Sequence, residues 1–460
     1  MNWPLLANSL LVSGLTTLLA SVLGAAVALA ALGLPPRGRQ LVLAGAVCTL
    51  VLPPFLVTGC WLDLLGQSAN WDASLPFSLF SRGGAVWLLT LLSWPVTTFL
   101  ALGAWSRLEA GQLEIEPRLR GWTLLRRVLL PMAAPALGQS VALTFVLALN
   151  NFAIPVILQV KVYPEELWLA FTTRLDEAGA WAACLPAVVA PLVLLLLWRG
   201  RAVSWPAQGM PALAAAFRRQ LGPAMVWGTR VGALGLLALS LALPAQRILC
   251  SSRTWTELPN LFRAAPDTVW NSFAYAATTA TASVMIGLVS WRLPIGLMLW
   301  VPFLIPGVLL GRLMIALFNG TPLSGTAWVV LLAFALRYLA PAWNLSASAC
   351  RGLDRDLTDA ARGYGARGWA LFRDVTWPQL KAQVAGAWYV TYLLCLWDVE
   401  TLVLIYPPGG ETLALRSFNL LHYGHNAQVN ALCVTLLALA VAPMLVWRFG
   451  LAGRAGTRVQ

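Results

Sequence analysis

Four polar residues within apolar stretches are the first candidates for chemistry in this chain of 460 residues. Asp398 and Glu400 lie in the outer part of one stretch, and Asn150 and Asn151 lie at the matching depth in another. Ionisable groups within a membrane are costly, and they usually face a cavity or a partner. Two interpretations stay open. The four side chains line a polar translocation pathway, or the carboxylates pair with Arg312, which is expected at a similar depth.

The sequence gives little support for metal binding or catalysis. Arg337 also falls in an apolar stretch, from which it is expected to extend to the membrane interface. His422 and His425 have the spacing of a metal pair, but no further ligand accompanies them, so neither a metal nor a cofactor is expected. We find no catalytic triad or paired catalytic carboxylates, and the chain is not expected to be an enzyme.

The chain also lacks an ATP-binding loop of its own. A P-loop requires Gly-Lys followed by Ser or Thr. The only lysines are Lys161, which follows Val160, and Lys381, which follows Leu380. If transport uses ATP, the ATPase must therefore be a separate polypeptide.

A basic segment between two apolar stretches carries a spaced motif. Asp359, Ala360 and Ala361 are followed by Gly365 and then by the segment that ends at Pro378. Small alanines permit close approach of a partner surface, and glycine permits a sharp turn. A proline is harmless in the first turn of a helix, where its missing N–H would have no partner. The segment is therefore expected to form a short surface helix that contacts another protein.

The same segment recurs in the first part of the chain. Gly121 to Pro131 matches Gly368 to Pro378, whereas Glu114 lies where the Asp-Ala-Ala motif is degenerate. At a slightly different offset, Asn8-Ser9 matches Asn271-Ser272, and Gly24 matches Gly287. The matched residues include Gly, Trp, Pro, Asn and Ser, which argues against chance similarity of apolar sequence. The order of the parts predicts two parallel homologous halves.

Composition indicates what surrounds these segments. The chain is 59% hydrophobic and only 11% charged, against about 25% charged in a soluble domain. Apolar windows of about 20 residues predict an all-α polytopic membrane protein. About eleven spans are expected, with ten to twelve allowed: 9–34, 40–63, 83–104, 135–158, 179–198, 225–246, 269–291, 294–318, 324–346, 382–404 and 427–447. The bilayer therefore explains the composition, and the formal charge of +13 does not indicate a nucleic-acid partner.

The cations set the expected topology. Most of the 31 Lys and Arg residues fall on one side if the loop with Arg37 and Arg39 is cytoplasmic. The N-terminus is then outside and the C-terminus cytoplasmic. We expect a first half at 1–198, a cytoplasmic linker at 199–224 that is rich in Arg and Pro, and a second half at 225–460.

The Asp359–Pro378 spacing resembles the ATPase-coupling motif of ATP-binding-cassette (ABC) importer permeases. Leu396 to Arg416, with the turn Pro407-Pro408-Gly409, is similar to fused permeases of the iron(III)/thiamine/phosphonate branch. The resemblance implies a bacterial inner-membrane subunit that is driven by two cytoplasmic ATPase subunits. It also implies an extracytoplasmic solute-binding protein that docks on the outward loops 159–178 and 405–426 and delivers iron(III), thiamine, a phosphonate or a similar solute.

Two rival functions make different predictions. A secondary transporter without ATP predicts inverted repeats or ion-coupling acids and does not need two matched basic loops. A polytopic membrane enzyme predicts clustered acidic or histidine residues in a loop near the interface, and the sequence has no such cluster.

Overall fold

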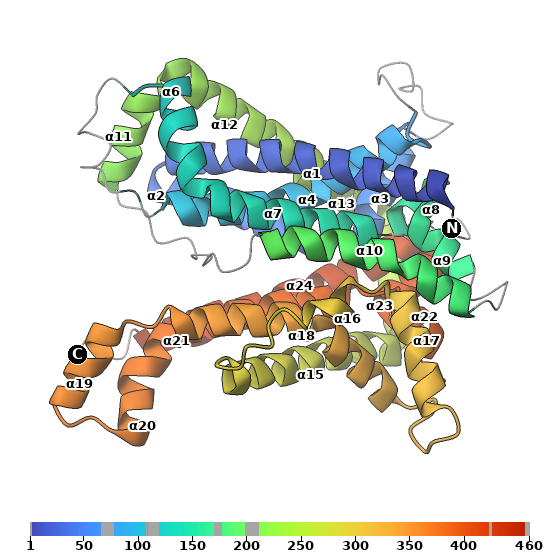
Figure 1. The fold of residues 1–460 in the computed structure, drawn as a ribbon. Coiled ribbons are helices and arrows are strands. Elements are labelled where there is room, and N and C mark those ends of the chain that lie inside the picture. The colour runs from blue at the N-terminus through green and yellow to red at the C-terminus, as the bar shows by residue number, and fades with distance from the viewer. Residues whose placement is uncertain are drawn as a thin grey trace. The chain divides into compact units, whose positions relative to one another are not determined.

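A computed structural model describes residues 2–65, 78–106, 108, 119–151, 153–169, 177–197, 211–422 and 426–455. Their regular structure is helical throughout, with no strand among them. The chain forms two compact units, Met1–Thr254 and Trp255–Gln460 (Figure 1). The all-α fold expected from the apolar windows is confirmed.

The first unit is built around three long helices: α1 (Trp3–Leu32), α4 (Arg82–Trp105) and α7 (Leu130–Asn150), which pack against one another. Its further elements are α2 (Pro36–Val51), α3 (Pro54–Leu65), α6 (Trp122–Leu124), the π-helical turn η2 (Leu125–Leu129), α8 (Ala153–Ile157), α9 (Tyr163–Leu169), α10 (Glu177–Leu197), α11 (Pro211–Leu221), α12 (Pro223–Leu237), η4 (Ala238–Ala242) and α13 (Leu243–Cys250).

The second unit repeats this plan with α15 (Pro266–Ser290), α18 (Ala327–Arg351) and α21 (Trp377–Leu396). Around them lie α16 (Trp300–Leu304), α17 (Gly307–Phe318), α19 (Arg355–Gly363), α20 (Gly368–Leu371), η5 (Phe372–Thr376), α22 (Leu402–Ile405), α23 (Leu413–His422) and α24 (Asn426–Ala455). The boundary between the units falls within α14 (Ser252–Ala264).

Matched glycines mark the same helix crossing in both units. A Cβ atom on Gly24 of α1 would overlap the carbonyl oxygen of Trp94 on α4. A Cβ atom on Gly287 of α15 would lie 3.0 Å from Cα of Trp343 on α18. Because each glycine contacts a tryptophan on the second long helix of its unit, the sequence repeat corresponds to a repeated packing arrangement.

Proline positions explain three π-helical turns. The turns η2, η4 and η5 end two residues before Pro131, Pro244 and Pro378 respectively. A proline cannot donate to the carbonyl four residues earlier, and its ring collides with that carbonyl in an α-helix. One wider turn removes the collision and lets the helix continue.

Prolines also interrupt two of the expected spans. The window 40–63 is divided between α2 and α3, which meet at 90° beside Pro53. The window 294–318 is divided between α16 and α17 at Ile305-Pro306. A residue before proline avoids the α conformation, and both Leu52 and Ile305 are extended, with ψ of 129°.

Seven described helices are long and apolar enough to cross a membrane, or eight if the bent pair is one span. Cys184–Val193 and Gly307–Phe318 are shorter apolar helices. A multi-pass membrane protein is confirmed, whereas the count of eleven spans stays a prediction. The helix Pro223–Cys250, which the sequence assigned to the second half, packs on α1 and α2 of the first unit. The division at 198 and 225 also stays a prediction.

Candidate coupling and translocation site

The expected surface helix in the second unit is α19, and none of its residues is buried. Asp354 caps its N-terminus, because one carboxylate oxygen accepts from the backbone N–H of Asp356 at 2.9 Å and of Leu357 at 3.2 Å. The backbone N–H of Asp354 in turn donates to Gln379 of α21 at 3.0 Å. The capped start of α19 is therefore tied to a long helix of the core.

Gly365 ends α19 in a left-handed conformation, with φ of +85°. The N–H of Ala366 donates to the carbonyl of Ala361, and the N–H of Gly365 donates to the carbonyl of Arg362. This pair of bonds is a Schellman motif, which places glycine directly after the helix. The glycine of the sequence motif is thus explained by the helix end that it forms.

Asp359 and Ala360 are exposed on α19, and Ala361 is half-buried. Asp359 forms an exposed ion pair with Arg362 at 3.0 Å, which contributes little stability at a surface. Pro378 is the second residue of α21, as expected for a helix start. Aromatic side chains flank the same segment and are exposed: Tyr364, Trp369, Phe372 and Trp377.

The matching loop of the first unit is partly covered by the linker helix. Gly121 has the same conformation as Gly368, with φ of +52° and +53°. The Gly121 N–H donates to the carbonyl of Gln220 on α11 at 2.8 Å, whereas a Cβ on Gly368 would meet nothing within 4 Å. Pro131 is the second residue of α7. Glu114 lies outside the described residues, as does His425 of the histidine pair.

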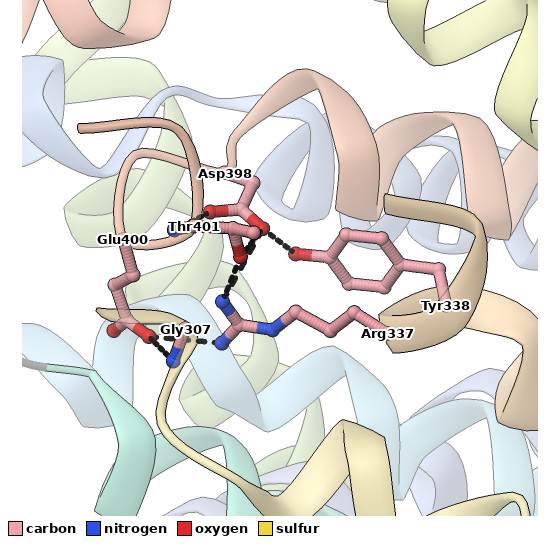
Figure 2. A network of polar contacts seen from close by, with 6 residues as sticks. All are labelled: Gly307, Arg337, Tyr338, Asp398, Glu400 and Thr401. Atoms are coloured by element: carbon pink, nitrogen blue, oxygen red, sulfur yellow. Dashed lines mark hydrogen bonds and ion pairs between the residues drawn. The ribbon is translucent and has the colours of Figure 1, made fainter. Parts of the chain in front are cut away.

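The carboxylates Asp398 and Glu400 bind one guanidinium group in the second unit (Figure 2). That group belongs to Arg337 of α18, which lies 3.3 Å from Asp398 and 2.8 Å from Glu400. Arg337 also donates to the hydroxyl of Thr401 at 2.6 Å, and the Tyr338 hydroxyl donates to Asp398 at 2.7 Å. The Asp398 side chain is 1% exposed, and that of Glu400 is 14% exposed.

This cluster provides hydrogen-bond partners where two helices are interrupted. Asp398 accepts from the backbone N–H of Thr401 at 2.8 Å, beside the break between α21 and α22. Glu400 accepts from the N–H of Gly307 at 3.4 Å, where α17 begins. Irregular backbone at membrane depth needs such internal partners. The cluster thus joins α17, α18 and the break after α21.

The partner of the carboxylates differs from the one suggested by the sequence. Both recorded ion pairs go to Arg337, and Arg312 lies half-buried on α17. Arg337 does not extend to an interface, because it is 7% exposed and enclosed by the cluster. The depth of a residue along a span does not give the direction of its side chain, which the packing of α18 decides.

The described part of the first unit repeats the capped break without matching ion pairs. The amide oxygen of Asn151 accepts from the N–H of Ile154 at 3.1 Å, which matches the bond between Asp398 and Thr401. Asn150, the last residue of α7, is 8% exposed, and its amide oxygen has no hydrogen-bond partner among the described residues. Sequence reasoning missed Thr401, although Asp or Asn three residues before a helical N–H is a known capping pattern.

Comparison with known proteins identifies the family. No family model matches the chain. It is similar to a protein named as a 2-aminoethylphosphonate transport system permease, PhnV of Salmonella paratyphi A, with 29% identity over 33% of this chain and 58% of that protein. It is 25% identical to the putrescine transport system permease protein PotI of Escherichia coli K12, over 38% of this chain and 69% of PotI.

A third relative is a protein named as a molybdenum ABC transporter permease from Haloferax volcanii, 30% identical over 41% of this chain and 72% of that protein. The chain belongs to the ABC transporter permease family. The similarity to PhnV spans less than two thirds of PhnV itself. For this permease, the surface helix α19 and the buried cluster are the parts with recognisable chemistry.

Proposed function

We propose that this permease is the membrane subunit of an ATP-driven ABC importer and moves a small solute into the cytoplasm. The observation that carries the proposal is α19: an exposed helix, capped at both ends and tied to α21, that carries Asp359, Ala360 and Ala361. Its rigid ends and its link to the core suit a helix that transmits force from a partner to the membrane helices.

Two cytoplasmic ATPase subunits are the proposed partners, one for each half. The exposed aromatic residues near α19 support this role, since Tyr364 is 95% exposed and Trp369 is 71% exposed. Large exposed aromatic groups are typical of protein interfaces. In the first half, the segment that includes Glu114, Gly121 and Pro131 would bind the second ATPase.

The proposed topology follows from the cations. The N-terminus lies outside the bacterial inner membrane, and the C-terminus and α19 lie in the cytoplasm. An extracytoplasmic binding protein then docks on the loops around 159–178 and 405–426, which include α9 and α23. Transport alternates between outward- and inward-facing states that the partners bind differently.

The proposed pathway includes Asn150 and Asn151 at the end of α7. In the second half, Glu400 is the member of the cluster that can face the pathway, because its side chain is more exposed than that of Asp398. Arg312 stays a proposed pathway residue on α17. The proposed solute is iron(III), thiamine, a phosphonate or a similar small molecule, and the name of PhnV supports the phosphonate class.

Reconstitution tests the proposal. The permease, its genetically neighbouring ATPase and the neighbouring binding protein are placed in proteoliposomes, and ATP hydrolysis and uptake are measured together. We expect uptake that requires ATP and the binding protein. Uptake that follows an ion gradient without ATP would overturn the proposal in favour of a secondary transporter.

A variant of Gly365 tests the coupling helix itself. Gly365→Val should lower the uptake per ATP hydrolysed at least tenfold, because valine does not tolerate a φ of +85°. Gly365→Asn should keep most of the coupling, since asparagine enters this conformation more readily. Gly363→Val is the matched control, because Gly363 is exposed and lacks a positive φ. Normal coupling in Gly365→Val would contradict the assignment.

A further inference from the structure

The repeated Asn-Ser pairs of the first long helices have a structural partner in both units. Ser9 of α1 accepts a hydrogen bond from the backbone N–H of Tyr163 at 2.7 Å. Ser272 of α15 accepts one from the backbone N–H of Leu413 at 2.8 Å. All four residues are buried, with exposed fractions of 3%, 1%, 2% and 0% respectively.

Both donors occupy the same place in their elements. Tyr163 is the first residue of α9, and Leu413 is the first residue of α23. The first N–H groups of a helix have no partner within that helix. Ser9 and Ser272 therefore supply the cap for a short helix from a different, long helix. Isolated helices of seven and ten residues would not be stable in water, so they depend on such contacts.

Further bonds fix the geometry. The Ser272 hydroxyl donates to the carbonyl of Thr268 at 2.7 Å, which leaves its oxygen free to accept from Leu413. The neighbouring Asn271 donates to the carbonyl of Gly409 at 2.7 Å. Residues four positions before the two capped amides, Gln159 and Gly409, both have a positive φ, of 56° and 75°. The two units thus use the same turn, the same cap and the same helix start.

We propose that Ser9 and Ser272 are positioning residues that fix α9 and α23 to the first long helix of each half. The surface that receives the binding protein then moves as one body with α1 and α15. Docking on α9 and α23 is in this way linked to the rearrangement of the long helices. This proposal rests on the proposed function, because it requires a binding protein that docks on this side.

The substitutions Ser9→Ala and Ser272→Ala test it. Matched controls are Ser21→Ala on α1 and Ser283→Ala on α15, whose buried hydroxyl oxygens have no hydrogen-bond partner among the described residues. Ser9→Thr and Ser272→Thr keep a hydroxyl and serve as rescue variants. The first measurement is hydrogen exchange of the peptides that contain α9 and α23, in the full chain in nanodiscs.

We expect exchange at the start of α9 or α23 to rise roughly five- to thirty-fold on loss of its cap. The second measurement is ATP hydrolysis by the assembled transporter against the concentration of the neighbouring binding protein. The half-maximal concentration should rise by a similar factor, while the basal rate and the maximal rate stay unchanged. The control and rescue variants should behave as the unmodified chain.

The possible failures differ from one another. Unchanged exchange in both alanine variants would overturn the cap. Faster exchange with an unchanged half-maximal concentration would overturn the positioning role and leave the proposed function intact. A permease whose ATPase partner does not respond to the binding protein would overturn the proposed function, and with it the role of the caps in docking.

Discussion

The two halves contain the same helix break, but the side chains around it are charged and polar in the second unit and apolar in the first. In the second unit, Asp398 caps the break and lies within a cluster that contains Arg337, Tyr338, Glu400 and Thr401. The matching cap of the first unit is Asn151, and the same repeat matches Glu400 and Thr401 with Ala153 and Ile154. The equivalent glycine contacts of Trp94 and Trp343 align Arg337 and Tyr338 with Leu88 and Leu89, so these four positions are apolar in the first unit. Leu88 and Ile154 are fully buried.

The helix break requires the side-chain cap but not the ion pairs. Both halves keep a side-chain oxygen that accepts from the N–H three residues later, so the cap is the shared requirement. Among the described residues, the ion pairs at the break are present in the second half alone, so they are not needed to form a break. Replacement of a buried ion pair by apolar residues is often neutral, whereas removal of one partner is strongly destabilising.

The largest expected effect therefore comes from the loss of the cation alone. Arg337→Leu leaves two carboxylates in a buried site without a counter-charge, which should cost about 3–5 kcal/mol. This is a large part of the free energy of unfolding of a typical protein. We expect little folded permease, measured as the monodisperse fraction after detergent extraction and as the midpoint of thermal unfolding.

The variant to compare with Arg337→Leu is a transplant that carries the first-half residues at all five positions of the cluster. The combined change Arg337→Leu, Tyr338→Leu, Asp398→Asn, Glu400→Ala and Thr401→Ile keeps the cap and removes every charge. It should recover at least half of the stability that Arg337→Leu loses. A transplant that is as unstable as the single variant would show that the ion pairs themselves hold the break.

The cluster also marks the limit of what the sequence predicts. The motif from Asp359 to Pro378 has a local cause, a capped helix that ends at Gly365, and it could be recognised from spacing. The partner of Asp398 depends on which face of α18 packs on the break. Spacing along the chain does not contain that information, so depth along the span suggests Arg312 as a partner, whereas the structure pairs Asp398 with Arg337.

The fold shows the same division between local and distant causes. Apolar length predicted the long helices, because it depends on composition within one segment. The breaks at Pro53 and Pro306 were signalled by the prolines themselves, yet hydropathy windows pass over them. The packing of α12 on α1 could not be predicted, because both halves offer apolar surfaces to such a helix.

The helix crossings give a second, smaller contrast. Gly24→Ala should cost about 1–3 kcal/mol, because the new Cβ meets a backbone oxygen of Trp94 that cannot move aside easily. Gly287→Ala should cost less, since its nearest neighbours lie at 3.0 Å. Gly14→Ala on α1 is the control, with nothing within 4 Å of the added atom. Thermal unfolding in detergent measures all three, and equal losses at Gly24 and Gly287 would contradict the difference between the crossings.

The end of α1 provides a third contrast, in the first unit. Arg218 and Arg230 both donate to the carbonyl of Gly33 at the end of α1, at 3.4 Å and 3.1 Å. Cations at a helix C-terminus are stabilising. The double change to alanine should cost about 1–2 kcal/mol locally and speed hydrogen exchange around residues 28–36. The end of α15, around residues 286–292, is the internal control and should not change.

The smallest expected effect concerns the turns before α9 and α23. Gln159 and Gly409 both have a positive φ, which glycine adopts without strain and glutamine does not. Both are exposed, so side-chain packing contributes little. Gln159→Gly should raise the free energy of unfolding by about 0.5–1 kcal/mol, and Gly409→Gln should lower it by a similar amount. Opposite shifts of the unfolding midpoint would confirm that the halves share one turn. Shifts of the same sign would show that the two turns are held differently.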